Sequence, residues 1–380
     1  MKKVPIRNLK EGIIFTEPVF IEGDNLLVPA GVEVRKKDIN RLVSWGVEYV
    51  ETEGELIHPA IKTPIVVKPD SLASSAPYRG YLNMIEKMNQ VCNNITAGIS
   101  IEVIFINEIS GQLLRSVREQ RSAFISFILG GDIKGRDMAK SMVNTAILAS
   151  LTAIELKLPN HRVLHTVTGA LLHDMGMLRL PKNIVDKRGG LSPIELQRVQ
   201  SHTLHSFKIA SKEMHFPADV GAIVLQHHER WDGEGYPRGI SGEEIDIGAR
   251  IVSVADAFEA MISQKPYRNP MIGYQAMKNL MADNLRRFDP NVIKAFITTM
   301  GIYPIGSMVL LNNGAYAKVI EVKSSSPLRP KVRVVLDSSG NVPAKEDSNI
   351  IDLLIDKNYF ISKAVDPKEI NPKYERDSQV

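Results

Sequence analysis

The sequence has little of several features that assign a protein to a class. It has 380 residues and a single cysteine, Cys92, so no intrachain disulfide can form and the composition suits a reducing cytoplasm. The N-terminus lacks the apolar core of a signal peptide, and no run elsewhere reaches the ~18 apolar residues of a membrane span. We therefore expect a soluble, cytoplasmic protein with no membrane span.

An excess of one charge is also absent. The formal net charge is +4, and lysine and glutamate are interspersed rather than grouped in blocks. This pattern does not indicate a nucleic-acid polymer as a partner, and a small anionic ligand fits it equally well. With 44% hydrophobic and 24% charged residues, the chain has a globular composition and the length for two or three domains.

Residues 1–60 alternate short apolar runs with turn residues. The pattern predicts a β-hairpin over residues 13–29, turning at Gly23-Asp24-Asn25, then a helix at residues 37–43 and a strand at residues 47–50. No cluster of catalytic side chains lies in this small α/β module. We expect it to regulate the protein or to dock a signalling-protein partner.

Residues 61–77 have the proline and serine content of a linker. Residues 78–129 contain no proline and repeat apolar residues at helical spacing, for example Leu82, Ile85 and Met88, which predicts a connector of one or two long helices. These helices could form a coiled dimer interface or a layer packed on the following region. The sequence leaves both alternatives open, and with them a homodimer.

Residues 130–300 are helix-rich. We expect apolar helices at residues 141–156 and 161–172. A further helix should start at Ser192-Pro193-Ile194-Glu195, which supplies a capping hydroxyl, a proline in the first turn and a reciprocal carboxylate. The pattern then changes to strands, which predicts a small β appendage over residues 301–365, followed by a loose tail at residues 366–380. The predicted fold class is α+β and multidomain.

Two dipeptides in this region carry the chemistry. His227-His228 is poor material for a core, because a buried imidazole without a partner leaves polar nitrogens unsatisfied. Successive side chains at a helix end point about 100° apart, so the two imidazoles cannot simply duplicate each other on a single ion. In His173-Asp174 the carboxylate can bridge two ions while the imidazole binds one. The spacing therefore indicates two metals.

At these residues the chain resembles the HD-GYP family, a branch of the HD phosphohydrolases whose members hydrolyse the bacterial second messenger cyclic di-GMP. Four motifs in the family's order carry the resemblance: His173-Asp174-Met175-Gly176, His227-His228-Glu229, Asp232-Gly233-x-Gly235-Tyr236-Pro237 and Val254-Ala255-Asp256-Ala257-Phe258. It implies an all-α HD-GYP catalytic domain over residues 130–300. The flanking regions resemble the small modules often found before and after such domains.

The resemblance also implies a set of metal ligands, made of both dipeptides and two further side chains: His173, Asp174, His202, His227, His228 and Asp256. Four neutral imidazoles and two carboxylates favour two divalent transition-metal ions, iron or manganese, over magnesium or calcium. Such a pair can lower the pKa of a bridging water. The implied reaction is hydrolysis of cyclic di-GMP to linear pGpG by a metal-bridging hydroxide, with His173 and Asp174 as catalytic residues, and further hydrolysis to GMP stays open.

Other residues receive roles from the same resemblance. Tyr236 presents an aromatic face on which a guanine could stack, although a tyrosine packing the loop on the helices is a real alternative. Lys265 and Arg268 match a basic pair that contacts the substrate. Glu229 and Asp232 are expected to orient neighbouring groups. The remaining histidines of the region are expected to be structural or exposed: His161, His165, His205 and His215.

Two departures from the family weaken the prediction of activity. Many members have a lysine where this chain has Met177, which cannot donate a hydrogen bond to phosphate. Some members hold a third metal at positions that match Asp137 and Ser141, of which Asp137 could still be a ligand and Ser141 is a poor one. A degenerate cyclic-dinucleotide receptor that signals through its N-terminal module is therefore an alternative. An HD hydrolase acting on another nucleotide is disfavoured by the complete Gly235-Tyr236-Pro237 motif.

Overall fold

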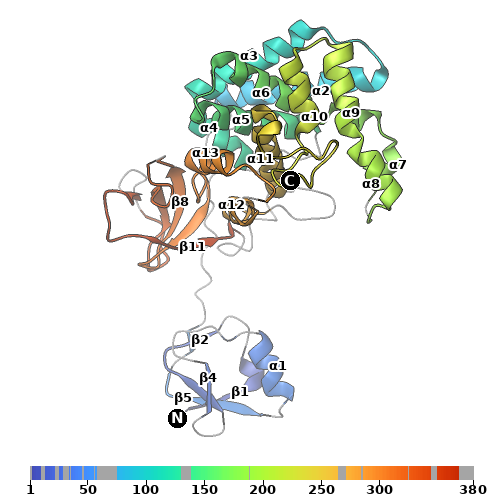
Figure 1. Ribbon diagram of the computed structural model, residues 1–380. Coiled ribbons are helices and arrows are strands. Elements are labelled where there is room, and N and C mark those ends of the chain that lie inside the picture. Colours follow the sequence, from blue (N-terminus) through green and yellow to red (C-terminus); the bar gives the residue numbers. More distant parts are fainter. Residues whose placement is uncertain are drawn as a thin grey trace. The chain divides into compact units, whose positions relative to one another are not determined.

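The computed structural model divides the chain into two compact units, Met1–Val66 and Val67–Glu375, which are described separately (Figure 1). The structure describes residues 2–9, 13–21, 25–28, 34, 36–44, 47–54, 56–57, 75–129, 138–187, 189–263, 271–283, 286–323, 325–343 and 349–367.

The first unit is a small α/β module, as the sequence predicts. Its main sheet is antiparallel with the order β1 (Lys2–Pro5), β5 (Tyr49–Thr52), β3 (Val19–Ile21) and β4 (Asn25–Val28). The pairing of β3 with β4 confirms the predicted hairpin, whose turn residues Gly23 and Asp24 lie outside the described residues. A second, two-stranded pairing joins β2 (Ile14–Phe15) to β6 (Leu56–Ile57), and α1 spans Lys36–Ser44. The unit has its own apolar core.

Three helices, rather than one or two, fill residues 75–129. They are α2 (Ala76–Ala97), α3 (Val103–Glu119) and α4 (Arg121–Leu129), and α2 begins inside the predicted linker. Their buried side chains belong to one apolar core that continues as far as Ile305. Helix α2 packs on α5 (Met138–Glu155), and α3 packs on α6 (Asn160–Leu172). The structure therefore shows a packed helical layer, the second of the two predicted alternatives.

Helices α5 and α6 form the centre of the second unit (Figure 1). An unbroken run of α5, from Met142 to Ala153, is buried, which explains its mostly apolar sequence with only small polar side chains between the apolar ones. Helix α11 (Ile247–Ile262) packs on both, and α10 (Ala218–Gln226) packs on α6 and α11. These contacts place the C-terminal ends of α6 and α10 beside α11.

Several short helices connect α6 to α10 in the sequence. They are η3 (Met175–Arg179), α7 (Lys182–Val185), α8 (Pro193–Gln200), α9 (His202–Phe207) and η4 (Lys208–Glu213). The predicted capping box is confirmed, because the Glu195 amide donates to Ser192 Oγ and the Ser192 amide donates to the Glu195 carboxylate. The helix that starts there ends at Gln200, and His202 begins the next one.

The second unit ends in two helices and a sheet. Helices α12 (Gly273–Ala282) and α13 (Pro290–Met300) precede an antiparallel sheet with the order β10-β9-β8-β7-β11. The three predicted strands correspond to β7 (Met308–Leu311), β8 (Tyr316–Glu321) and β9 (Lys331–Leu336). The sequence did not predict β10 (Ile350–Asp352) and β11 (Ile361–Val365). Among the described residues, no helix combines the length and apolarity required to cross a membrane.

Candidate metal centre

Five of the six predicted ligands lie at helix ends, and the sixth lies within a helix. His173 follows the last residue of α6, and Asp174 comes next in the chain. His227 and His228 stand in the same relation to α10. His202 is the first residue of α9, and Asp256 projects from within α11. These elements are connected by packing, because α6, α10 and α11 pack on one another and α9 packs on α10.

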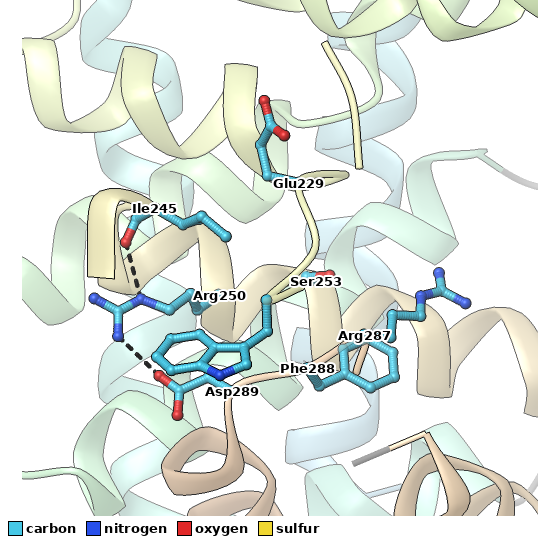
Figure 2. Close-up of a pocket in the computed structure, with 8 residues that line it drawn as sticks. Glu229, Ile245, Arg250, Ser253, Arg287, Phe288 and Asp289 are labelled. Atoms are coloured by element: carbon cyan, nitrogen blue, oxygen red, sulfur yellow. Dashed lines mark hydrogen bonds and ion pairs between the residues drawn. The ribbon is translucent and has the colours of Figure 1, made fainter. Parts of the chain in front are cut away.

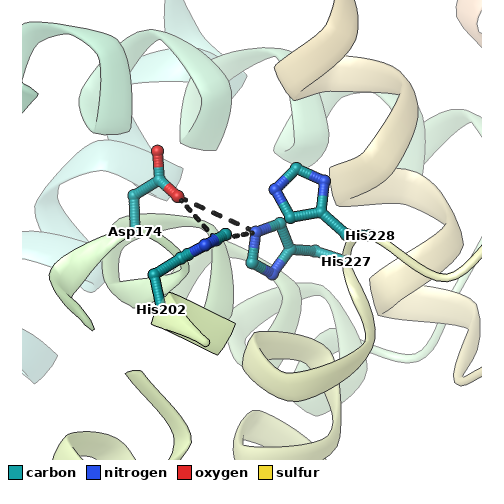
Figure 3. A group of neighbouring side chains, drawn as sticks. All are labelled: Asp174, His202, His227 and His228. Carbon is teal, nitrogen blue, oxygen red and sulfur yellow. Dashed lines mark hydrogen bonds and ion pairs between the residues drawn. The ribbon is translucent and has the colours of Figure 1, made fainter. Parts of the chain in front are cut away.

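The six side chains form two groups that share Asp174. Potential ligand atoms of Asp174, His202, His227 and His228 lie within 4.8 Å of one another (Figure 3). Potential ligand atoms of His173, Asp174 and Asp256 do the same. A carboxylate that binds two ions must belong to both ligand groups, and Asp174 meets this requirement.

Each oxygen of Asp174 faces a different group. Asp174 Oδ1 lies 3.2 Å from His202 Nε2 and 3.8 Å from His227 Nε2. Asp174 Oδ2 lies 3.6 Å from His173 Nε2, which is itself 3.6 Å from Asp256 Oδ1. The side chain is thus placed to give one oxygen to each group.

Backbone carbonyls fix the orientation of three imidazoles. His173 Nδ1 lies 2.7 Å from the Ala170 carbonyl oxygen. His202 Nδ1 lies 2.6 Å from the Val199 carbonyl oxygen, and His227 Nδ1 lies 2.8 Å from the Val224 carbonyl oxygen. A carbonyl oxygen can only accept, so Nδ1 carries the proton in each ring. Nε2 of each ring faces the centre, and in the neutral ring it presents a lone pair there, the arrangement found in metal-binding histidines.

In the part of the chain that the structure describes, these nitrogens have no suitable hydrogen-bond donor. Nε2 of His202 and Nε2 of His227 lie 3.3 Å apart, and two unprotonated nitrogens cannot hydrogen-bond to each other. His173 Nε2 is buried without a hydrogen-bond partner among the described residues. Leaving such a group unsatisfied costs roughly 1–3 kcal/mol. A cation bound between these nitrogens and the carboxylates removes the conflict, so the donor set fits a metal.

The charges of the centre are strongly coupled. Burial, then the neighbouring imidazoles, lower the pKa of His227 well below its usual value and that of His228 to about 3. Burial also acts to lower the pKa of His173, but the carboxylates of Asp174 and Asp256 outweigh it and raise that pKa to about 9. Burial opposes ionisation of Asp174, yet the imidazoles of His173 and His202 hold its pKa well below the usual range. The carboxylate is therefore charged and attracts cations.

Comparison with known proteins assigns the region around this centre. A sequence model of the HD domain matches residues 118–292. This region belongs to the HD domain family. A model of the KOW domain associated with the HD domain matches residues 308–373, which contain the C-terminal sheet.

Similar proteins carry functional names. "Cyclic di-GMP phosphodiesterase PA4108" of Pseudomonas aeruginosa is 31% identical over 258 residues, 67% of this chain and 61% of that protein. "Cyclic di-GMP phosphodiesterase PdeB" of Borreliella burgdorferi is 30% identical over 228 residues, 60% of each chain. A "Cyclic di-GMP phosphodiesterase" of Thermotoga maritima is 42% identical over 129 residues, 34% of this chain and 35% of that one. The chain thus spans about 60% of the length of the first two relatives. The match to the HD domain and the names of these relatives confirm the predicted family.

A tight loop follows His228 in the HD domain. A Cβ atom at Gly235 would lie 2.6 Å from the His228 carbonyl oxygen and 2.6 Å from Glu229 Cα, so only glycine fits. Gly233 has a φ of 81°, a left-handed conformation that also favours glycine. The buried Glu229 carboxylate accepts hydrogen bonds from the amides of Arg238 and Gly239 at 2.7 and 3.0 Å. Glu229 therefore holds the loop closed, and Asp232 pairs with Arg230 at 2.6 Å.

The loop places Tyr236 against the centre. Its amide donates to the His228 carbonyl at 3.2 Å, and its ring stacks on the His228 ring with centroids 4.8 Å apart and planes 29° apart. Burial and the charges of Asp174 and Asp256 raise the pKa of the Tyr236 hydroxyl above its usual value. One face of the tyrosine ring is thus covered by His228.

The other predicted site residues have different outcomes. Asp137, Lys265 and Arg268 lie outside the described residues. Ser141 donates a 2.6 Å hydrogen bond to the buried Glu259 carboxylate, which also accepts from Asn144 and Ser263. Ser141 is therefore engaged in a carboxylate network that joins α5 to α11.

Met177 and the histidines expected to be structural lie outside the two ligand groups. Met177 is half-buried and is not among the described side chains that pack on the main apolar core. His165 lies 3.1 Å from an Asp219 oxygen, and His161 packs edge-on against His165. Neither these two nor His205 and His215 belong to a described ligand group.

Sequence reasoning missed Glu259 and Arg287. Glu259 follows Asp256 by three residues, so helical periodicity could have placed it on a similar face. Arg287 carries no comparable signal, because only the tertiary structure brings residues 286–287 to the loop. There Trp231 and Asp232 donate backbone hydrogen bonds to the carbonyls of Arg287 and Arg286 at 3.0 and 2.9 Å.

Arg250 packs beside the contact between the loop and residues 286–287 (Figure 2). Arg250 donates to the Ile245 carbonyl at 2.9 Å and to Asp289 at 2.8 Å, and its guanidinium lies 5.6 Å from the centre of the Trp231 ring. The cavity between these residues has a volume of only about 10 Å³. It is large enough for about one water molecule, so it is a structural junction and not a substrate site.

Proposed function

We propose that the chain is a metal-dependent phosphodiesterase that hydrolyses cyclic di-GMP to linear pGpG. The observation that carries the proposal is the pair of ligand groups sharing Asp174, with one carboxylate oxygen facing each group. Two divalent ions, for which iron or manganese suit the donor set, would supply an activated water and neutralise phosphate charge when bound. Hydrolysis by this route forms no covalent enzyme intermediate.

The names of similar proteins support this substrate. The three relatives compared above are among those named cyclic di-GMP phosphodiesterases, and two others from Vibrio cholerae are named 3′3′-cGAMP-specific phosphodiesterases at 33% identity. The shared chemistry of all these names is hydrolysis of a phosphodiester in a cyclic dinucleotide. Cyclic di-GMP is the substrate that the more similar relatives favour.

In this proposal, separate residues of the chain bind the metal ions, bind the substrate and hold the loop in place. His173, His202, His227 and His228 bind the ions through neutral nitrogens, and Asp174 and Asp256 add the negative charge. Tyr236 offers its free face to a guanine, while Lys265 and Arg268 offset phosphate charge. Glu229 keeps the loop in the conformation that sets Tyr236 beside His228.

A receptor is the second candidate function. Met177 cannot donate a hydrogen bond where many related domains have a lysine, and this observation favours a protein that binds the dinucleotide without efficient turnover. Both functions use the same metal centre and the same loop. Turnover therefore separates them, and binding alone does not.

The deciding experiment is turnover of cyclic di-GMP by anaerobically purified protein, with the metal content of the same sample measured by elemental analysis. We expect pGpG to accumulate and the protein to carry about two metal equivalents. Tight binding of cyclic di-GMP by the fully metal-loaded protein without any product would establish the receptor function instead. Three tightly held ions per chain would show that the ligand set is larger than proposed.

A further inference from the structure

Arg287 is fixed beside the loop that carries Tyr236. Its carbonyl accepts from the Trp231 amide at 3.0 Å, and the Arg286 carbonyl accepts from the Asp232 amide at 2.9 Å. This short backbone pairing joins residues 286–287 to the first residues of the loop. Because both bonds use backbone atoms, the position of Arg287 does not depend on its own side chain.

The Arg287 guanidinium is available for a ligand. It rests on the Phe288 ring, 5.0 Å from the ring centre, and among the described residues it forms no ion pair. Two arginines nearby are already paired, Arg230 with Asp232 at 2.6 Å and Arg250 with Asp289 at 2.8 Å. In Figure 2 the side chain of Arg287 extends away from the Arg250–Asp289 pair.

Backbone contacts place Arg287 at the start of this loop. Its partner Trp231 follows the candidate ligand His228 by three residues, and Arg287 lines a small cavity together with Glu229, the residue directly after His228. Arg287 makes no hydrogen bond or ion pair with any of the six ligand residues in the described part of the chain. Arg287 therefore lies beside the loop and outside both ligand groups.

We propose that Arg287 is a specificity-determining residue that binds the second phosphodiester of a cyclic dinucleotide, the one that is not being cleaved. This inference rests on the proposed function. A cyclic dinucleotide has two phosphates, and one of them must lie away from the ions while the other reacts. A guanidinium fork can donate two parallel hydrogen bonds to that phosphate, while the base stacks on the free face of Tyr236.

The test compares two substrates and three variants. Cyclic di-GMP has two phosphodiesters, whereas bis(p-nitrophenyl) phosphate has one. Arg287→Ala should raise the KM and Kd for cyclic di-GMP about tenfold to a hundredfold, the range expected for charge-assisted hydrogen bonds. The same variant should keep wild-type metal content and wild-type kcat/KM with bis(p-nitrophenyl) phosphate. Arg287→Lys should recover part of the loss, because it restores the charge but not the fork.

Arg286→Ala is the matched control. Arg286 has the same charge, is exposed and contributes the neighbouring backbone bond, so its truncation should leave both substrates unaffected. Equal cyclic di-GMP affinity in Arg287→Ala and Arg286→Ala would overturn the inference. A loss of metal or of bis(p-nitrophenyl) phosphate turnover in Arg287→Ala would also overturn it, because the residue would then support the centre itself.

Failure of the proposed function has a different signature. Wild-type protein that cleaves bis(p-nitrophenyl) phosphate but neither binds nor cleaves cyclic di-GMP would reject cyclic di-GMP as the substrate. The same comparison would then be made with 3′3′-cGAMP, which also has two phosphodiesters. A wild-type protein that binds neither dinucleotide would reject the role of Arg287 as well.

Discussion

At the scale of single residues, Asp174 is the side chain on which both ligand groups depend. Asp174→Ala removes the oxygens that face His173 on one side and His202 and His227 on the other. We expect loss of most of the bound metal and of phosphodiesterase activity, because a shared carboxylate serves both ions. Elemental analysis and turnover of cyclic di-GMP measure the two effects.

The exposed carboxylate of Glu243 provides the control for this change. Glu243→Ala removes one exposed negative charge that belongs to neither described ligand group and should retain metal and activity. Full activity in Asp174→Ala would contradict the assignment of the centre.

Met177 is the residue at which the sequence departs most clearly from the HD-GYP pattern. A lysine there could donate a charge-assisted hydrogen bond to the substrate phosphate, worth about 1.5–3 kcal/mol and up to roughly a hundredfold in rate. Met177→Lys should therefore raise kcat. Because Met177 is half-buried and does not pack on the main apolar core, we expect only a small decrease in Tm.

Parallel measurements of kcat, Tm and metal content decide the matter for Met177→Lys. A stable, metal-loaded variant with no gain in turnover would show that this methionine does not limit catalysis.

At the scale of structural elements, the loop between His228 and Gly239 depends on the close backbone approach at Gly235. In Gly235→Ala the new methyl would approach the Glu229 Cα and the His228 carbonyl to 2.6 Å, and both are backbone atoms that cannot move aside easily. We expect the loop and Tyr236 to shift, with lower affinity for cyclic di-GMP and a lower Tm. Calorimetric binding and thermal unfolding measure these changes.

Gly80→Ala is a matched substitution in α2. No atom lies within 4 Å of the Cβ that it adds, and alanine is preferred over glycine in a helix by roughly 0.5–1 kcal/mol. This variant should be slightly more stable than the wild type and bind cyclic di-GMP normally. Equal behaviour of the two variants would show that the close approach at Gly235 has no functional consequence.

Another element-level contact is the carboxylate network between α5 and α11. Ser141→Ala leaves the buried Glu259 with one hydrogen-bond donor fewer, while Asn144 and Ser263 remain. We expect the free energy of unfolding to fall by about 1–3 kcal/mol, as measured by denaturant titration. Metal content should stay at the wild-type level, and a loss of one metal equivalent would instead identify Ser141 as a ligand.

At the scale of the whole molecule, metal removal should act on the second unit alone. The two units have separate apolar cores, and the six candidate ligands lie in the second. Chelation should lower the Tm of the larger calorimetric transition, because ions that bind only the folded state stabilise it by about 2.7 kcal/mol at a hundred times their Kd. The smaller transition should not move.

Asp174→Ala serves as the control for the chelation experiment. Its larger transition should already be shifted downward and should respond little to the chelator. An identical response in the wild type and in Asp174→Ala would mean that the chelator destabilises the protein by another route.

The sequence by itself determined the local and chemical features of this protein. Helical periodicity predicted α5 and α6, the capping box predicted the start of α8, and the two dipeptides with Asp256 predicted the residues that the fold gathers at the centre. These features could be predicted because each depends on side chains that are close in the chain or that form a known ordered motif.

Only the tertiary structure decided the contacts between segments distant in the sequence. Packing between separate elements forms the helical layer of α2 to α4 and places His228 against one face of Tyr236. Packing of the same kind brings Ser141 to Glu259 and places Arg287 beside the loop. Short edge strands such as β10 and β11 were missed because their pairing, rather than their own residues, stabilises them. Residue chemistry predicts which groups can bind a metal, but the close packing of helices fixes which groups face one another.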